Sequence, residues 1–444
     1  MLEPTKSPDG SNTQTQAGNY FISNYPPFSF WENGLADNYY DRLSKPPHPD
    51  ASLGLYVHIP FCRKRCHFCY FKVYTDRNAT DIGKYLDAIG REARLYKEQP
   101  VFSGRKPRFI YFGGGTPSYL SPSQLENVVD QLKKAFPWDE AEEIAFEAEP
   151  GTLNESKLKM IRAIGVTRLS LGVENFNDEI LAQNNRAHRS GEIIRAYDYS
   201  RNIGFPQINI DLIAGLLGET DNNWTDCIRK TLELKPDCVT IYQMEIPFNT
   251  TIYKQMKNEG EITAPVADWE TKRRWVAEAF EELESNGYTV TSAYTAVRDP
   301  KKINFIYRDD LWTGADLLSL GVSSFGHVNG LHYQNIKDFQ PYLNVVNDHQ
   351  FPIRRTYQMD FHEKMVREFI LQWKLGKIDR DYFTRKFNID VYDFFSEPLE
   401  NLIQSGIVTA GEHEACINRQ GLLQIDQLIR KFFLPQHRGM GQYT

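Results

Sequence analysis

The feature that most constrains the fold is a regular alternation of short apolar runs and amphipathic stretches between residues 55 and 245. Each apolar run has the length of a buried parallel strand, and each amphipathic stretch has the spacing of a surface helix. Because the unit recurs six times, the sequence predicts a parallel α/β sheet, either curled or open. Ligands of such folds bind at the carboxyl ends of the strands. The predicted strands cover residues 55–59, 109–112, 144–149, 168–173, 208–216 and 238–244.

The segments outside this alternation differ in composition. Residues 1–18 are polar and rich in Ser, Thr, Gln and Gly, which predicts a disordered tail. Residues 19–52 carry many aromatic side chains between prolines, so this arm is expected either to staple onto the core or to cover a site as a lid. We expect the α/β domain and its extension to span residues 53–340. Helical periodicity with a short β segment over residues 356–444 predicts an α-rich, winged-helix-like C-terminal domain.

Charge and hydropathy exclude several classes of function. The 444 residues include 51 basic and 58 acidic ones, a net charge of −7, which argues against general nucleic-acid binding. No apolar run approaches the roughly 18 residues that a membrane-spanning helix requires. The first residues lack the apolar segment of a secretory signal. We therefore expect a cytoplasmic, monomeric protein with no membrane span and no nucleic-acid partner.

Three cysteines lie within eight residues, directly after the first predicted strand, in Cys62-Arg-Lys-Arg-Cys66-His-Phe-Cys69. Three thiolates on one tight loop can hold three irons of a 4Fe–4S cluster, which leaves the fourth iron open to a small chelating ligand. Zinc with His67 as a fourth ligand is an alternative, although no second cysteine pair is present. Cysteines that bind no metal are disfavoured at this spacing, because clustered thiolates require a cation or oxidation.

This cysteine motif after the first strand of an α/β barrel resembles the radical S-adenosylmethionine (SAM) superfamily. Further motifs between residues 56 and 335 resemble the oxygen-independent coproporphyrinogen III oxidase family, whose relatives include haem chaperones, class C radical SAM methyltransferases and anaerobic haem-degrading enzymes. These motifs are Tyr56-Val-His58-Ile-Pro-Phe-Cys62, Tyr111-Phe-Gly113-Gly-Gly115-Thr116-Pro, Glu147-Ala-Glu149-Pro, Gly172-Val-Glu174-Asn-Phe-Asn177 and Asn209-Ile-Asp211-Leu-Ile-Ala-Gly215.

The resemblance implies both a fold and a chemistry. The fold is a partial (β/α)6 barrel of the radical SAM type with an α-rich C-terminal domain. The catalytic cysteines hold a 4Fe–4S cluster, whose electron cleaves SAM to methionine and a 5′-deoxyadenosyl radical. That radical abstracts hydrogen from a tetrapyrrole or comparable large substrate, and the electron comes from a donor such as flavodoxin or ferredoxin. In such a reaction the cofactor carries the chemistry and the protein positions it.

The resemblance also assigns cofactor contacts. Tyr56 is expected on the adenine side of the first SAM, and Gly114 and Glu147 at its cationic amine. Phe68, between two cysteine ligands, packs either near this cofactor or in the core of the loop. A second SAM is implied, and Asp211 in its site is alternatively a member of an ordinary salt bridge. The expected contacts of the second SAM are Gly115, Thr116, Glu174, Arg186, Asp211 and Phe325.

Departures from the family pattern leave the reaction open. The oxidases have a further cysteine at the position of Phe71, usually Gln at Glu174, and many relatives have Gly-Leu-Pro where Gly215 is followed by two leucines. The alternatives to a coproporphyrinogen oxidase are a class C methyltransferase that uses two SAM molecules and a haem-binding chaperone on the same scaffold. His327 and His332 are candidate haem ligands or proton donors, and otherwise satisfied polar groups in a turn.

Overall fold

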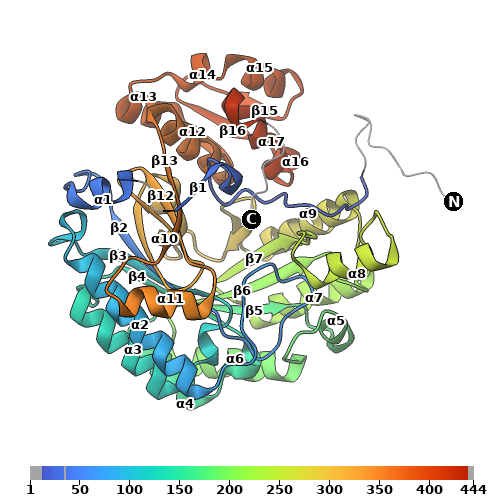
Figure 1. The fold of residues 1–444 in the computed structure, drawn as a ribbon. Helices are drawn as coiled ribbons and strands as arrows, with labels where there is room; N and C mark the ends of the chain where they lie inside the picture. The colour runs from blue at the N-terminus through green and yellow to red at the C-terminus, as the bar shows by residue number, and fades with distance from the viewer. Residues whose placement is uncertain (1–12, 35–36, 439–444) are drawn as a thin grey trace.

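The structure is a computed structural model that describes residues 13–34 and 37–438. At the centre of the described chain, six strands run parallel in chain order (Figure 1). Each strand begins and ends within two residues of the range predicted from the sequence, which confirms the repeated strand–helix unit. The strands are β2 (Leu53–Ile59), β3 (Pro107–Gly114), β4 (Glu143–Ala148), β5 (Arg168–Glu174), β6 (Gln207–Ala214) and β7 (Cys238–Gln243).

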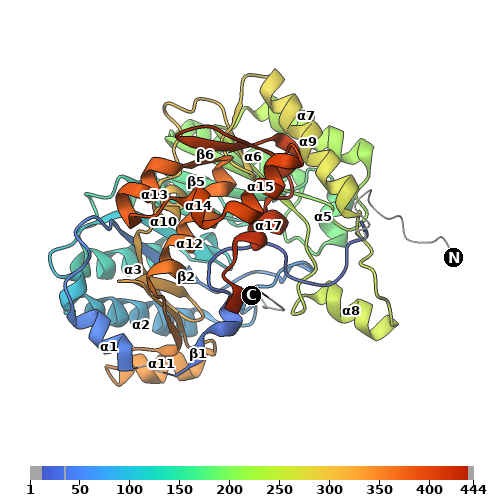
Figure 2. The ribbon, with the colours of Figure 1, turned by 90° about the horizontal axis from the view of Figure 1, so that it is seen from above.

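Helices cover the outer face of this sheet, so the other face lines the interior of a barrel (Figures 1 and 2). Leu86 and Ile89 of α2 and Val128 of α3 belong to the same buried core as Phe112 of β3. Apolar side chains that recur every three or four residues produce this one-sided burial. The outer helices are α2 (Ala79–Lys97), α3 (Pro122–Ala135), α4 (Glu155–Ala163), α5 (Asp178–Gln183), α6 (Ser190–Ile203), α7 (Asp221–Leu234) and α9 (Trp269–Ser285).

Further strands extend both edges of the sheet. The strand order runs from β1 at one edge to β8 at the other, so the described chain forms an open barrel rather than a closed ring. On one side β10 (Asp316–Leu320) pairs parallel with β2 and leads to antiparallel β11 (Phe325–Val328), β12 (Leu331–Asn335), β13 (Ile353–Gln358) and β1 (Glu32–Asn33). On the other side lie β9 (Thr295–Val297) and β8 (Thr289–Val290). The accompanying helices are α1 (Asp37–Ser44), α8 (Thr251–Glu259), α10 (Ile306–Trp312) and α11 (Phe339–Asn347).

The C-terminal region is mainly helical and has its own core. Phe369, Trp373, Phe395 and Phe432 are buried together and stack on one another. In Figure 1 these helices lie above the barrel, and β15 and β16 of the small sheet β14–β16–β15 lie among them. The elements are α12 (Phe361–Gln372), β14 (Lys377–Asp379), α13 (Arg380–Phe387), α14 (Val391–Phe394), α15 (Ser396–Gln404), β15 (Val408–Ala410), β16 (Glu414–Ile417), α16 (Arg419–Leu422) and α17 (Ile425–Leu428).

Part of the predicted disordered tail is packed. Residues 1–12 lie outside the described residues, but the Thr13 carbonyl accepts from the backbone N–H of Trp269 at 2.9 Å. Thr15 is buried, and its hydroxyl accepts from the Lys272 ammonium at 2.7 Å. The tail prediction is therefore wrong for residues 13–18, because a buried ammonium of α9 requires an acceptor that composition does not reveal.

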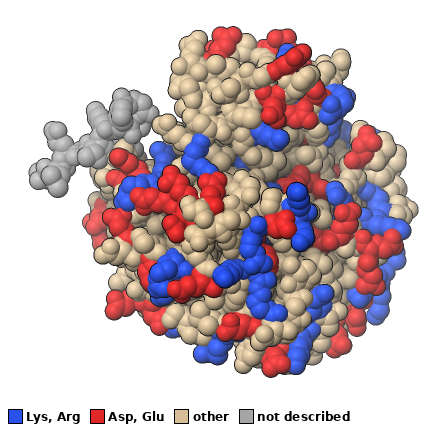
Figure 3. Space-filling view, turned by 180° about the vertical axis from the view of Figure 1, so that it is seen from behind, with Lys and Arg blue, Asp and Glu red and all other residues tan. Residues whose placement is uncertain are grey.

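Charged side chains of both signs are mixed on the surface. On the face shown in Figure 3, Lys and Arg side chains are interspersed with Asp and Glu. Within the described chain, no helix has the length and apolarity needed to cross a membrane.

Candidate functional site

The three clustered cysteines lie on the loop between β2 and α2. Backbone hydrogen bonds shape this loop: Cys62 N–H donates to Tyr74 O at 3.1 Å, and Cys69 N–H donates to Cys66 O at 3.2 Å. All three thiols are free. The sulfurs have donors nearby, since the Thr116 hydroxyl lies 3.3 Å from Cys62 Sγ and the Arg186 guanidinium lies 3.3 Å from Cys66 Sγ. The Thr116 hydroxyl thus donates to one of the three sulfurs and the Arg186 guanidinium donates to another.

These cysteines open into a cavity of about 450 Å³ at the carboxyl ends of the parallel strands. This is the position that the fold class predicts for a ligand site. Of the site residues expected from the sequence, eight line the cavity with the cysteines and two do not. Those that line it are Phe68, Gly114, Gly115, Thr116, Glu147, Glu174, Arg186 and Asp211.

The residues of the loop fit an iron–sulfur cluster. Burial raises the pKa of Cys62 to about 11 and that of Cys69 to about 12, so the sulfurs require a bound cation to ionise at neutral pH. Gly115 leaves room beside the sulfur, because a Cβ there would lie 3.0 Å from Cys62 Sγ. Among the described residues, no three His, Cys, Asp or Glu side chains converge on one metal ion. Thiolates that bind different irons of a cluster need not converge, whereas zinc ligands must.

The glycine run after β3 brings backbone close to the cysteine loop. Gly114 has φ +113°, which favours glycine, and a Cβ there would lie 2.5 Å from the His58 ring. Its N–H donates to Glu147 Oε2 at 3.1 Å. The Gly115 N–H donates to Ile59 O at 2.8 Å, which ties the run to the end of β2. A side chain at either position would move the backbone away from the cysteines.

Three carboxyl groups face the cavity from neighbouring strands. Burial raises the pKa of Glu147 and of Glu174 to about 7, and it also raises the pKa of Asp211. Glu147 accepts from the Tyr111 hydroxyl at 2.7 Å. The partners of Asp211 are the Ser170 hydroxyl at 2.6 Å and the Asn209 amide at 2.9 Å, rather than an arginine. Buried acids in one cavity repel each other when ionised, so the site is suited to a cationic ligand.

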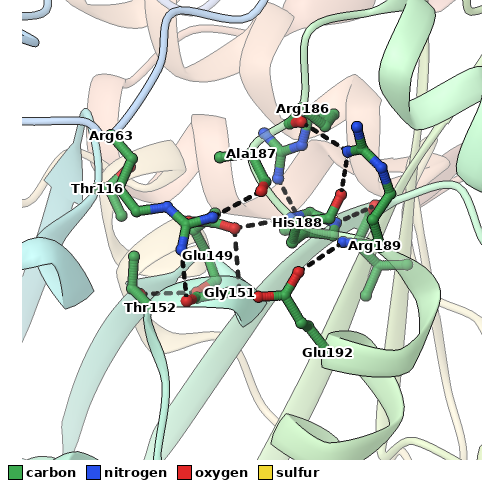
Figure 4. A network of polar contacts seen from close by, with 12 residues as sticks. Arg63, Thr116, Glu149, Gly151, Thr152, Arg186, Ala187, His188, Arg189 and Glu192 are labelled. Atoms are coloured by element: carbon green, nitrogen blue, oxygen red, sulfur yellow. Dashed lines mark hydrogen bonds and ion pairs between the residues drawn. The ribbon is translucent and has the colours of Figure 1, made fainter.

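Arg186 lies between the cysteines and these acids. Its guanidinium donates to Gly172 O at 2.5 Å and lies 3.5 Å from Glu174 Oε1, in addition to its contact with Cys66. Glu174 has φ +65°, an uncommon backbone conformation for a residue with a side chain. The sequence assigns Arg186 to a second SAM, but the structure places it against the cysteine loop as well. Figure 4 shows Arg186 beside Ala187, His188 and Arg189, in the network of polar contacts that includes Arg63 and Glu149.

Tyr56 does not line the cavity. Its ring stacks on Tyr111, with centroids 5.8 Å apart, and its hydroxyl forms a 3.2 Å hydrogen bond with His58 Nδ1. Tyr56 therefore supports Tyr111, which does line the cavity and donates to Glu147.

Phe325 lies elsewhere. It is on β11 and packs against Phe28 and Trp31 of the arm, with ring centroids 4.4 and 5.8 Å apart. Phe325 does not line the cavity, because the antiparallel strands beyond β10 turn this side chain toward the arm; its contact with a second SAM stays a prediction. His332 also contacts the arm: its Nε2 lies 3.0 Å from Tyr25 O and its ring stacks on Trp31. It is a satisfied polar group in a hairpin.

Side chains from outside the barrel close the cavity, and no motif in the sequence predicted which ones. Tyr20 and Phe21 of the arm line it, whereas Phe28 and Trp31 do not. The C-terminal region contributes residues 423, 424, 426 and 427. Aromatic rings complete the wall. Only the aromatic content of residues 19–52 signalled a lid, and it did not distinguish which rings face the cavity. The further aromatic lining residues are Tyr70, Phe71, Tyr242, Trp269, Tyr294 and Phe305.

A comparison with known families identifies the barrel. The sequence model of the radical SAM superfamily matches residues 56–231, which contain the cysteine loop and the strands that line the cavity. The chain carries a radical SAM domain. Such a domain implies a 4Fe–4S cluster and SAM, and the geometry described above fits the cluster.

The known proteins that are similar to this chain include heme chaperones and coproporphyrinogen oxidases. Heme chaperone HemW of Bacillus subtilis is 27% identical over 384 residues, which cover 85% of this chain and 98% of HemW. Oxygen-independent coproporphyrinogen III oxidase of Escherichia coli is 27% identical over 415 residues, 89% of either chain. The solved structure of coproporphyrinogen III oxidase (HemN) of Escherichia coli superposes with a TM-score of 0.81 at 24% identity, covering 94% of this chain and 99% of that one. The similarity in fold to this solved structure thus extends to the helical C-terminal region.

Proposed function

We propose that this chain is a radical SAM enzyme that acts on a tetrapyrrole or a comparable large substrate. The observation that carries the proposal is that three free cysteines and the carboxyl groups of Glu147, Glu174 and Asp211 line a single cavity. The relatives named for coproporphyrinogen and for haem support a tetrapyrrole as the substrate class. The aromatic wall supports it too, since flat rings stack on aromatic side chains.

In this proposal the chain's own residues hold and orient the cofactors. Cys62, Cys66 and Cys69 hold the cluster. Glu147 and the backbone at Gly114 bind the ammonium group of a SAM next to it. When bound, the cluster and SAM supply the 5′-deoxyadenosyl radical that abstracts hydrogen. The protein needs an external one-electron donor, such as flavodoxin or ferredoxin.

The same cavity offers a place for a second SAM. Glu174, Asp211 and Thr116 are the contacts that remain from the sequence prediction, and Gly115 and Phe68 lie close to the cysteines. Arg186 lies between the two sets and would contact a carboxylate of either ligand. Two molecules of SAM are therefore part of the proposal.

The arm and the C-terminal region close the cavity. The Tyr20 N–H donates to Glu245 at 3.2 Å, and the Ile22 N–H donates to Asp426 at 2.8 Å. Lys374 joins this contact, donating to Ile22 O at 2.6 Å and Asp426 at 2.7 Å. The arm is thus held across the cavity mouth, where it excludes water and protects a reactive radical from side reactions.

The test of the cluster uses cysteine variants. Anaerobically reconstituted protein should bind about four irons per chain. Cys66→Ala should lose both the cluster and SAM cleavage, while Cys416→Ala, which removes an exposed cysteine outside the cavity, should keep both. A Cys66→Ala protein with a full cluster and normal cleavage would overturn the assignment of the site.

Product analysis then separates the reactions. The loaded protein is incubated anaerobically with SAM, dithionite and a candidate tetrapyrrole. Oxidative decarboxylation yields CO2, and methyl transfer yields S-adenosylhomocysteine. A haem chaperone would bind haem and yield neither product; this is the second candidate, because HemW of Bacillus subtilis matches this chain over 98% of its length.

A further inference from the structure

Several side chains of the cysteine loop contact neighbouring segments: Arg65 donates to Asn249 O at 3.1 Å, and His67 Nδ1 lies 3.0 Å from Gln183 O. Arg63 directly follows Cys62, and its guanidinium donates to Gly151 O at 2.8 Å and to Ala187 O at 2.6 Å. Its Nε lies 3.7 Å from Glu149 Oε2. Figure 4 shows the guanidinium between these groups. The planar guanidinium group of Arg63 therefore joins the cysteine loop both to the segment after β4 and to the segment after α5.

The two segments that Arg63 contacts are held in place by a hydrogen bond between His188 and Glu149. His188 is fully buried, and its Nδ1 donates to Glu149 Oε1 at 2.9 Å. The same carboxylate oxygen accepts from the Gly151 N–H at 3.0 Å, which sets the turn that presents the Gly151 carbonyl. The other ring nitrogen of His188 lies 3.3 Å from Val173 O. The two segments that Arg63 joins are thus already held to each other and to β5.

A second arginine, Arg186, also connects the cysteine loop to the segment after α5, but it starts from the segment after α5 and contacts Cys66 Sγ of the loop. Arg189 holds the backbone between them, since its guanidinium donates to Arg186 O at 3.0 Å and to His188 O at 2.7 Å. Three successive carbonyls, those of residues 186, 187 and 188, accept from arginines. The position of Arg186 relative to the cysteines therefore depends on its own contact with Cys66 and on the contact of Arg63 with Ala187.

We propose that Arg63 is a positioning residue that holds the cysteine loop in register with the Arg186–His188 segment. Through this register it keeps the Arg186 guanidinium between Cys66 and Glu174, where it can meet a carboxylate of SAM. The effect on cofactor binding rests on the proposed function, whereas the anchoring of the loop does not. Arg63 itself need not touch the cofactor for either effect.

The first experiment measures the anchoring in cofactor-free protein. Hydrogen–deuterium exchange is compared for wild type, Arg63→Gln and Lys72→Gln, which removes an exposed positive charge from the same loop region. Loss of two hydrogen bonds from a charged donor should speed exchange of the amides of residues 66–69 and 186–189 by about tenfold in Arg63→Gln. Lys72→Gln should exchange as wild type does. Unchanged exchange in Arg63→Gln, in a protein that melts at the wild-type temperature, would overturn the proposal.

The second experiment measures the coupling to the cofactor site. With the three cysteines intact, Arg63→Gln should bind as much iron as wild type, but its SAM affinity should fall about tenfold. The SAM-induced change in the electron paramagnetic resonance spectrum of the reduced cluster should also be altered. Arg63→Lys should remain defective, because a point charge cannot serve two carbonyls as a planar fork does. Full recovery in Arg63→Lys would show that only charge matters and would refute the positioning role.

The outcomes separate this proposal from the proposed function. Faster exchange with normal SAM affinity would remove the coupling and leave only an anchor. Faster exchange in Arg63→Gln together with a wild-type protein that binds neither iron nor SAM would refute the proposed function and support the anchor.

Discussion

Glu92 provides a test of the fold that does not depend on any cofactor. It lies in the middle of α2 and is fully buried. Its carboxylate accepts from the Tyr342 hydroxyl at 2.6 Å, the Gly321 N–H at 2.9 Å and the Asn335 amide at 2.6 Å. It therefore ties α2 to the turn after β10 and to β12. Despite these donors, burial raises the pKa of Glu92 to about 7.

The sign and size of its effect on stability follow from this pKa. Because the folded protein holds the proton more tightly than the unfolded chain, whose glutamates titrate near 4.5, the stability from protonated Glu92 is fully present below about pH 4.5. It is lost as the pH rises through about 7. At about 1.4 kcal/mol for each pH unit over this window, the total loss is about 3 kcal/mol.

The assay compares Glu92→Gln with wild type in urea unfolding from pH 5 to pH 8. The amide is neutral at every pH, so the free energy of unfolding of the variant should rise relative to wild type by about 2–3 kcal/mol across this range. Any cost of placing the amide beside Asn335 is constant with pH and does not alter this trend. Glu126→Gln, at an exposed position of α3, should follow wild type. Parallel curves for Glu92→Gln and wild type would refute the reasoning.

Two further predictions concern the cavity. SAM binding at pH 7 should release protons, because a bound cation lowers the pKa values of Glu147 and Glu174, which are about 7 without it. Calorimetry of SAM binding in two buffers of different ionisation enthalpy measures this release. Identical binding heats in the two buffers would contradict the prediction. Phe21→Ala should keep the cluster but form 5′-deoxyadenosine without substrate product, since Phe21 lines the cavity and Phe30, whose alanine variant is the control, does not. Coupled turnover in Phe21→Ala would argue against the lid.

The sequence was sufficient wherever local patterns determine local structure. The six parallel strands follow from apolar runs such as residues 109–112, and the cysteine loop follows from its spacing after the first of them. Glu147, Glu174 and Asp211 end up in one cavity because parallel strands place their carboxyl ends side by side. The parallel pairing of the strands therefore brings residues that are far apart in the sequence close together in the cavity.

The remaining features depend on contacts that no local pattern encodes. Phe325 was assigned to a SAM site, but β11 runs antiparallel beyond β10 and presents this side chain to the arm. Aromatic residues of the arm also lie in different environments. Phe21 faces the cavity, whereas Tyr25 is buried in the C-terminal core and its hydroxyl forms a 2.7 Å hydrogen bond with His437. Aromatic content alone predicts that these rings are buried, but not where.

The charges of the cavity provide a physical reason why its ligand should carry charges of both signs. Glu147 lies near the end of β4 and Asp211 within β6. Among the described residues neither has an arginine partner in hydrogen-bond range, so each is costly to ionise in the site. Arg186 is buried beside Cys66, and Glu174 lies 3.5 Å from it. A ligand with an ammonium group and a carboxylate group would complete both halves of this arrangement, whereas a neutral ligand would leave buried charges without partners. If Arg63 positions the segment that carries Arg186, as proposed, the cysteine loop helps to set the distance between the positive and negative sides of the site.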